Sequence, residues 1–237
     1  MSRPMLEVIA LDAGDARAAQ HGGADRIELV SDMARWGLTP SAETVREVRA
    51  AVDLPVRVMV READGFAAGE VQVLRDRARE LLRAGAEEFV LGFLTPDGAV
   101  DLPAVEAVLE VLDGRPWTFH KAIDFAADRS AAWAALSGLP GLDAVLSSGG
   151  REGVAEGLTT LLAEHRALAG RGAPGERGAV PRLIAGGTLR EPEAAPLLAG
   201  GVNAFHVGTR ARPQGSWDHP VDPAAVRVWA DLLGGAS

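Results

Sequence analysis

The stretch GADRIEL, residues 23–29, recurs in altered form three more times along the chain. The other copies are GAEEFVL from Gly85, GLDAVL from Gly141 and GVNAFHV from Gly201, so the copies begin roughly 60 residues apart. Each copy opens with a glycine suited to the left-handed end of a helix and continues into an apolar, strand-like run. One βαβ crossover takes roughly 30 residues. The copies therefore mark every second strand of a long βα series.

Short apolar runs rich in β-branched and aromatic residues supply the strands of that series. We predict strands over residues 5–11, 26–30, 56–60, 88–93, 117–122, 143–148, 182–187 and 204–208, with the clearest helical patterns at 39–52 and 70–86. Eight βα units at this spacing fill the chain, which favours a closed barrel over an open doubly wound sheet. The sequence therefore predicts an α/β fold, a single (β/α)₈ TIM-like barrel domain over residues 1–237. The Gly- and Pro-rich residues 171–180 are typical of a surface loop.

Composition excludes several classes of function. The chain has no cysteine, so disulfides, thiolate metal sites and cysteine nucleophiles are ruled out. Its net charge of -9 disfavours binding to nucleic acid or to an anionic membrane surface. No apolar run is long enough to span a bilayer, and the first residues lack a signal-peptide pattern. We expect a soluble cytoplasmic protein.

Ionisable residues stand among apolar neighbours near the ends of five predicted strands. In a (β/α)₈ barrel the site lies at the carboxyl ends of the strands, and period-two alternation decides which side chains face the axis. On this basis the side chains at five positions should converge on the barrel axis, namely Glu7, Glu28, Arg61, His120 and His206. Asp124, in the loop after the fifth strand, should pair with Lys121 or orient His120. The predicted catalytic residues are therefore Glu7, Glu28, Arg61, His120, Asp124 and His206. The alternative is a stabilising charge network that plugs the barrel.

A second set of residues points to an anion site. Small and hydroxyl residues follow the sixth, seventh and eighth predicted strands, where the loops of such barrels often bind phosphate through backbone N–H groups. The predicted ligand-binding residues are Ser148, Gly149, Gly186, Gly187, Gly208 and Thr209. Tight strand-to-helix turns, which also require glycine, are the alternative explanation.

Lys121 is the only lysine of the chain and directly follows His120. Strand alternation sends the two side chains to opposite faces, so with His120 inside the barrel we expect Lys121 at the rim, as a salt-bridge partner. A Schiff-base role is the less favoured alternative, because it requires a desolvated lysine inside the pocket.

Six stretches together resemble the CutC family of copper homeostasis proteins, from about Met5 to about Arg210. They are MLEVIA (5–10), GADRIELVSDMARWGLTPS (23–41), LGFLTPDGAVDLP (91–103), TFHKAID (118–124), VLSSGG (145–150) and LIAGGTL (183–189). The resemblance implies a TIM-like barrel, a cytoplasmic location, a homo-oligomer and a link to copper. It also places the six predicted catalytic residues at polar positions of the family.

This chain departs from the family pattern at three places. Lys121 replaces the usual arginine, the loop after Arg61 is shorter than usual, and the cysteines proposed to hold copper in some members are missing. Copper is thus a cofactor implied by resemblance alone, and the metal ligands are unknown. His120 and His206 with Glu7 or Glu28 could hold a divalent ion instead.

Three functions remain open at this stage. The first is a CutC-like protein that binds or handles copper. The second is an enzyme of isomerase or lyase type on a small, phosphorylated or unphosphorylated metabolite. The third is a catalytically inactive barrel that acts through protein contacts. The expected partner is a small molecule or a metal ion.

Overall fold

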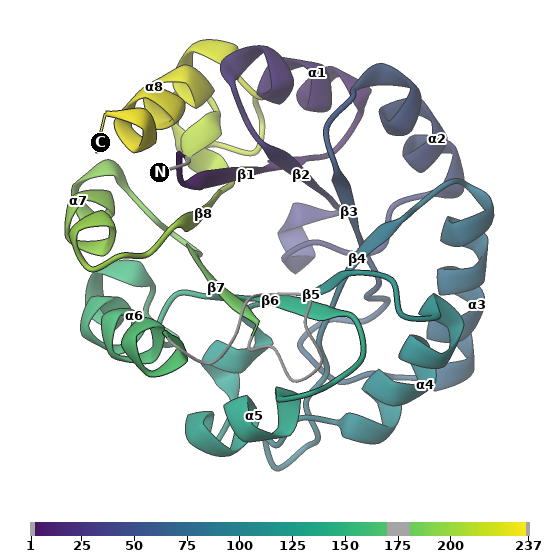
Figure 1. The fold of residues 1–237 in the computed structure, drawn as a ribbon. Helices are drawn as coiled ribbons and strands as arrows, with labels where there is room; N and C mark the ends of the chain where they lie inside the picture. The colour runs from purple at the N-terminus through teal and green to yellow at the C-terminus, as the bar shows by residue number, and fades with distance from the viewer. Residues whose placement is uncertain (1–2, 170–180, 236–237) are drawn as a thin grey trace.

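The computed structural model describes residues 3–169 and 181–235, whose eight parallel strands close into a barrel in the order β1 to β8 (Figure 1). The strands are β1 (Met5–Ala10), β2 (Arg26–Leu29), β3 (Val56–Met59), β4 (Glu88–Leu91), β5 (Trp117–Phe119), β6 (Leu142–Ser147), β7 (Arg182–Gly186) and β8 (Ala204–Val207). This confirms the predicted (β/α)₈ barrel and all eight strands. The predicted loop at 171–180 lies outside the described residues.

A helix follows every strand and packs on the outside of the barrel (Figure 1). The α-helices are α1 (Ala13–Gly22), α2 (Ala42–Ala51), α3 (Val71–Arg83), α4 (Leu102–Leu112), α5 (Arg129–Leu136), α6 (Val154–Leu168), α7 (Glu191–Ala199) and α8 (Pro223–Gly234). Short 3₁₀ helices are η1 (Met33–Arg35), η2 (Lys121–Phe125), η3 (Thr209–Ala211) and η4 (Pro213–Gly215). Within the described ranges, no helix is both long and apolar enough to cross a membrane.

The repeated glycine does what the sequence pattern predicts. Gly23, Gly85, Gly141 and Gly201 have φ angles of 97°, 97°, 75° and 90°, which lie in the left-handed region. Each precedes an even-numbered strand of the barrel. Glycine reaches this region without the steric cost that a Cβ atom brings. Gly23, Gly85 and Gly201 do so at the ends of α1, α3 and α7, whereas Gly141 lies beyond Ser137, the C-cap of α5, and directly before β6.

Two kinds of core hold the barrel together. The main apolar core includes Leu6, Val8, Ile27 and Leu29, which alternate along β1 and β2 with side chains of the opposite face. The barrel interior holds two small apolar clusters, one of which is Ile9, Val30, Met59 and Val90. The buried residues of the barrel strands also include ionisable ones, namely Glu7, Glu28, Arg57 and His206.

The amino-terminal floor of the barrel is an ion-pair network. The buried Arg57 guanidinium contacts Glu88 Oε2 at 3.0 Å, Asp143 Oδ2 at 2.6 Å and the hydroxyl of Thr118. A buried guanidinium needs such partners, since an unpaired buried charge is costly. This part of the interior agrees with the alternative prediction of a stabilising charge network.

Strand β5 ends at Phe119, three residues earlier than predicted, and η2 begins at Lys121. The Nδ1 atom of His120 accepts a hydrogen bond from the Ala122 backbone N–H, which starts this short helix. Strand alternation therefore stops before Lys121, and the prediction that it faces away from His120 loses its basis.

The contact between α6 and the end of β6 provides a test of the packing. A Cβ atom on Gly157 would lie 2.0 Å from the Ser148 carbonyl oxygen. We expect Gly157→Ala to lower the free energy of unfolding by roughly 2 kcal/mol or more through overpacking, although alanine is the better helix former. Urea unfolding followed by circular dichroism measures this.

Gly234→Ala in α8 is the matched control, because a Cβ atom there meets only the Arg3 side chain, at 3.5 Å. We expect it to change the unfolding free energy by less than about 1 kcal/mol. Equal effects of the two substitutions would contradict the packing described here.

Candidate functional site

A cavity of about 440 Å³ opens at the carboxyl ends of the strands. Four of the six predicted catalytic residues line it, namely Glu28, Arg61, His120 and His206. Glu7 lies beneath His206 and is hydrogen-bonded to it, whereas Asp124 does not line the cavity. The structure thus brings five of the six into one connected arrangement.

A carboxylate, an imidazole and a second carboxylate form the floor of the cavity. Glu7 Oε1 lies 2.8 Å from His206 Nδ1, and His206 Nε2 lies 3.6 Å from Glu28 Oε2. Glu7 also accepts a hydrogen bond from Arg26 Nε at 2.5 Å. Glu7 therefore orients the imidazole, and the other ring nitrogen faces Glu28.

The three groups have strongly perturbed proton affinities. Burial and the nearby Glu7 carboxylate together raise the pKa of Glu28 to about 7, against the opposing effects of His206 and Arg26. Burial would also raise the pKa of Glu7, but Arg26 and His206 bring it far below its usual range. Burial lowers the pKa of His206, yet Glu28 and Glu7 outweigh this and raise it. Glu7 is therefore a fixed carboxylate, whereas the pKa of Glu28 lies near neutral pH.

His120 is a neutral hydrogen-bond donor to the cavity. Burial lowers its pKa to about 3, and the positive charges of Arg61 and Lys121 act in the same direction. Its Nδ1 accepts from the Ala122 N–H, so the ring proton is on Nε2. In the described part of the chain, the buried Nε2 has no hydrogen-bond partner. It is therefore an unpaired, buried donor in a residue that lines the cavity.

Arg61 is held by backbone carbonyls rather than by carboxylates. Its guanidinium donates to the carbonyl oxygens of Arg35, Gly37 and Gly65 at distances from 2.7 to 2.9 Å. Its Cζ also lies 5.4 Å from the centroid of the Phe66 ring. These contacts fix the side chain at the cavity wall, where within the described residues no carboxylate lies within ion-pair distance of it.

Lys121 lines the same cavity as His120, and within the described residues no carboxylate lies within ion-pair distance of it, so the prediction of a salt bridge is wrong. Its Nζ lies 5.1 Å from the Trp36 ring centroid and 5.8 Å from that of Phe125. Burial lowers its pKa, and Asp124 only partly opposes this effect. The cause of the wrong prediction is the early end of β5, since η2 turns Lys121 toward the mouth of the barrel.

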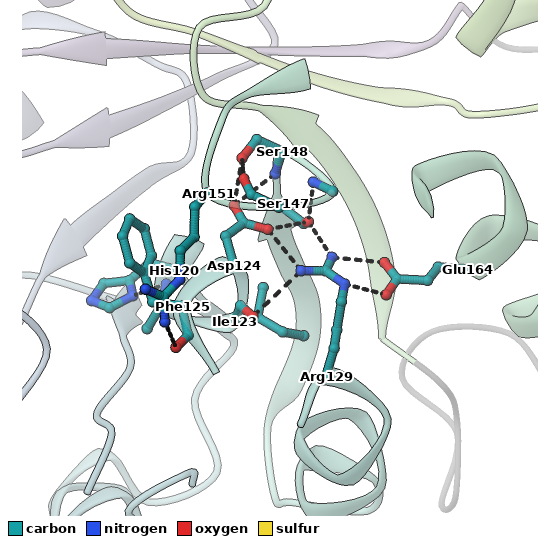
Figure 2. A network of polar contacts seen from close by, with 12 residues as sticks. His120, Ile123, Asp124, Phe125, Arg129, Ser147, Ser148, Arg151 and Glu164 are labelled. Carbon is teal, nitrogen blue, oxygen red and sulfur yellow. Dashed lines mark hydrogen bonds and ion pairs between the residues drawn. The ribbon is translucent and has the colours of Figure 1, made fainter. Parts of the chain in front are cut away.

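Asp124 anchors η2 to the end of β6 instead of facing a ligand (Figure 2). Its Oδ1 accepts from Arg129 Nη1 at 2.8 Å and from Ser147 Oγ at 2.7 Å. Its Oδ2 accepts from the backbone N–H and the hydroxyl of Ser148, at 2.8 and 2.7 Å. Glu164 binds the other side of Arg129, as Figure 2 shows. Neither Lys121 nor His120 is a hydrogen-bond partner of Asp124, so the two predicted contacts are absent from the described residues.

The predicted anion-binding residues divide into two groups. Gly187, Gly208 and Thr209 line the cavity, whereas Ser148, Gly149 and Gly186 do not. A Cβ atom at Gly186 would lie 2.7 Å from the His206 Cβ, and one at Gly149 would lie 2.2 Å from the Gly157 carbonyl oxygen. These two glycines make room for His206 and for α6.

The helix termini that follow β7 and β8 are poor sites for an anion. The N-terminus of α7 carries Glu193, whose Oε2 accepts from the Arg190 backbone N–H at 2.7 Å, and Glu191 is in its first turn. The segment after β8 forms only the three-residue η3, and a Cβ atom at Gly208 would lie 2.8 Å from the Trp217 ring. Acidic groups at a helix N-terminus repel a second anion.

Several cavity residues were missed by the sequence analysis. They are Trp36, Phe66, Phe125 and Trp217, the cations Arg151 and Arg210, and the thioethers Met33 and Met59. Most belong to loops or to short 3₁₀ helices, where no periodicity reveals direction. The exposed fraction of Trp36, 53%, is unusual for tryptophan.

The histidines and carboxylates of the cavity are poorly arranged to bind a divalent metal ion. Among residues 3–169 and 181–235, no group of three or more His, Asp or Glu side chains is placed to hold a metal ion. His120 could bind a metal through Nε2 only if its proton moved to Nδ1, which already accepts from Ala122. A divalent ion on His120 and His206 therefore fits poorly.

Comparisons with known proteins agree with this architecture. The sequence model described as the CutC family matches residues 5–210. A CutC family protein from Xanthomonas campestris pv. campestris (strain 8004) is 38% identical over 230 residues, which cover 95% of this chain and 91% of the relative. A Klebsiella pneumoniae (strain 342) relative of the same name is 33% identical over 205 residues, covering 85% and 78%.

Solved structures show the same fold. A Streptococcus agalactiae CutC protein, named for copper homeostasis, has a TM-score of 0.76 and 24% identity, covering 87% of this chain and 99% of its own. The KGPDC protein of Streptococcus mutans has a TM-score of 0.62 and 17% identity, covering 99% of both chains.

The Asp124 network yields a prediction for stability. Asp124→Asn places an amide N–H₂ group against the Ser148 N–H or against Arg129, which leaves donors facing donors. We expect it to lower the free energy of unfolding by roughly 2–4 kcal/mol. Urea unfolding measures this, with Asp97→Asn as the exposed control, for which we expect a change below about 0.5 kcal/mol. A loss at Asp124 no larger than the control would show that the network carries little energy.

Proposed function

The chain belongs to the CutC family, and we propose that it contributes to copper homeostasis, the role for which the S. agalactiae protein is named. We further propose that it is an enzyme of isomerase or lyase type, because its cavity suits that chemistry. Its substrate is a small anionic carbonyl compound. One observation carries the proposal. A neutral His120, whose buried Nε2–H has no partner within the described residues, lines the same cavity as Glu28, whose pKa is raised to about 7.

The chemistry of these two groups supports proton transfer at a carbon next to a carbonyl. The Glu28 carboxylate removes the proton, and its pKa near the working pH is what a general base needs. The electron pair of the broken C–H bond moves onto the carbonyl oxygen through a new C=C bond. His120 Nε2–H stabilises that oxygen as a hydrogen-bond donor. With an α-hydroxycarbonyl substrate, the hydroxyl proton moves to the enolate oxygen and the carbon-bound proton returns to the former carbonyl carbon, which completes an isomerisation. With a leaving group on the β-carbon, the enolate electron pair reforms the C=O bond, the C=C bond shifts to the α and β carbons, and the group departs with its bonding electrons, which completes an elimination.

Neighbouring residues hold these two groups in their working states. Glu7 keeps His206 oriented, and His206 takes up or supplies the proton that Glu28 exchanges. Burial keeps His120 neutral with the help of the Arg61 charge, and Arg61 places a positive charge near the developing oxyanion. Asp124 is a positioning residue, because it fixes the η2 segment that follows His120. We also propose the cytoplasm as the location and a homo-oligomer as the assembly.

Direct copper(I) binding is the second candidate, favoured by one observation. Met33 and Met59 are 26 residues apart in sequence, at no recognised spacing, yet both line the cavity. Thioether sulfur is a soft ligand that suits copper(I), and the chain has no cysteine to compete with it. Here copper is the cargo of the protein rather than a resident cofactor.

The enzyme proposal predicts a Glu28-dependent exchange of carbon-bound protons with solvent. In D₂O, a panel of small hydroxyaldehydes, hydroxyketones and sugar acids, with and without phosphate, is followed by ¹H NMR. We expect at least one compound to lose its α-proton signal, at a rate that rises as the pH passes about 7, because Glu28 must be ionised. Glu28→Gln should lower the rate by roughly 100-fold or more.

Glu110→Gln is the control for the exchange assay, because Glu110 is an exposed carboxylate of α4 paired with Arg75. It should exchange as the unsubstituted protein does. If no compound exchanges, or if Glu28→Gln exchanges as fast as the control, the proposed proton transfer is wrong.

The copper candidate predicts a thioether-dependent affinity. If copper(I) binds in the cavity, Met33→Leu with Met59→Leu should weaken it at least roughly tenfold, because both soft ligands are lost. Competition with a chromophoric copper(I) chelator under anaerobic conditions measures this. Met5→Leu is the control, since Met5 is at the amino-terminal end of β1. Equal affinities of the double variant and the control would remove direct copper handling.

A further inference from the structure

The charged side chains that line the cavity are mainly positive, although the protein as a whole is negatively charged. The chain has a net charge of -9, but four cations line the cavity with Glu28 as its one lining carboxylate among the described residues. The cations are Arg61, Lys121, Arg151 and Arg210. In the described ranges, none of them has a carboxylate within ion-pair distance. Elsewhere many arginines are paired, so this arrangement favours a bound anion.

Two of these cations flank one aromatic ring. Lys121 Nζ lies 5.8 Å from the Phe125 ring centroid, and Arg151 Cζ lies 5.4 Å from it. Arg151 Nη2 also donates to the Phe125 carbonyl oxygen at 3.2 Å, which ties its side chain to η2, as Figure 2 shows. Both cations therefore lie close to the same ring, one from η2 and one from the loop after β6.

The loop after β7 completes the wall beside these cations. Gly187 lines the cavity, and a Cβ atom there would lie 3.6 Å from Lys121 Nζ. Thr188, next in the chain, has a φ of 60°, which is uncommon for a β-branched residue. Strain of this kind is typical of sites where the backbone must approach a ligand. A larger residue at Gly187 would fill the space in front of the ammonium group.

We propose that Lys121 and Arg151, with the Gly187 backbone, bind the phosphate group of the substrate. This inference rests on the proposed function and narrows its substrate to a phosphate monoester. A phosphate monoester dianion carries the two negative charges that Lys121 and Arg151 balance, and a guanidinium binds two of its oxygens at once. The subsite thus lies mainly on side chains of η2 and the loop after β6, whereas the sequence pattern placed it on backbone N–H groups after β6, β7 and β8.

Inorganic phosphate is the probe that tests this subsite. Titration calorimetry, at an ionic strength held constant with chloride, should give one phosphate per chain. Lys121→Met and Arg151→Met should each weaken binding at least roughly tenfold, through the loss of a charge-assisted contact. Lys121→Arg should keep the affinity within about threefold, because it keeps the charge. Arg166→Met, at an exposed position of α6, is the control and should bind as the unsubstituted protein does.

The result that overturns the proposal is equally definite. If phosphate does not bind, or binds with the same affinity in Lys121→Met, Arg151→Met and the control, the subsite does not exist. Acetate that binds as tightly as phosphate would also contradict a phosphate site, because a monoanion should bind at least roughly tenfold more weakly. Circular dichroism confirms that each variant is folded, which we expect for Lys121→Met because Lys121 makes no hydrogen bond within the described residues.

The two proposals fail in different ways. Glu28-dependent exchange on an unphosphorylated compound, with no phosphate binding, would remove the subsite and leave the enzyme proposal standing. Phosphate binding that depends on Lys121 and Arg151, without exchange of any compound, would remove the proton transfer and leave an anion-binding cavity.

Discussion

The hydrogen bond between Glu7 and His206 is the interaction on which both the fold and the site depend. The two residues are direct partners in the pairing of β1 with β8, the pairing that closes the barrel, although they are 199 positions apart in the chain. Burying the Glu7 carboxylate without Arg26 and His206 beside it would cost free energy. The floor of the cavity is therefore stable only when β1 and β8 are paired and the barrel is closed. Formation of the barrel and assembly of the acid–base group are therefore one event.

The sequence contained enough information for the barrel and for the side chains that face its axis. The recurrent glycine at Gly23, Gly85, Gly141 and Gly201 predicts the strand count, because its role is local: it needs only a left-handed turn. Alternation along extended strands has a fixed period of two, which is why Glu28 and His206 were assigned correctly to the interior. Both inferences rest on short-range geometry.

The remainder of the site depends on geometry that no period describes. Lys121 was placed wrongly because β5 gives way to a 3₁₀ helix at that residue, and its turn is set by the hydrogen bond from Ala122 to His120. Trp36 and Phe125 come from separate loops and meet at a centroid distance of 5.6 Å, a contact that only the closed barrel creates. Glycines are ambiguous for a similar reason. Gly186 makes room for the side chain of His206 rather than for a ligand. The sequence alone does not show that these two residues are neighbours on adjacent strands.

The aromatic surroundings of Lys121 have a chemical consequence. This residue carries the one primary amine among the side chains of the protein, and burial makes that amine easier to deprotonate. An acylating or reductive-alkylating reagent therefore has a single side-chain target, at the entrance of the barrel between Trp36 and Phe125. Lys121 is therefore a natural position for site-specific labelling. A fluorophore or an isotopic tag attached there would report whether the entrance is occupied, without any engineered cysteine.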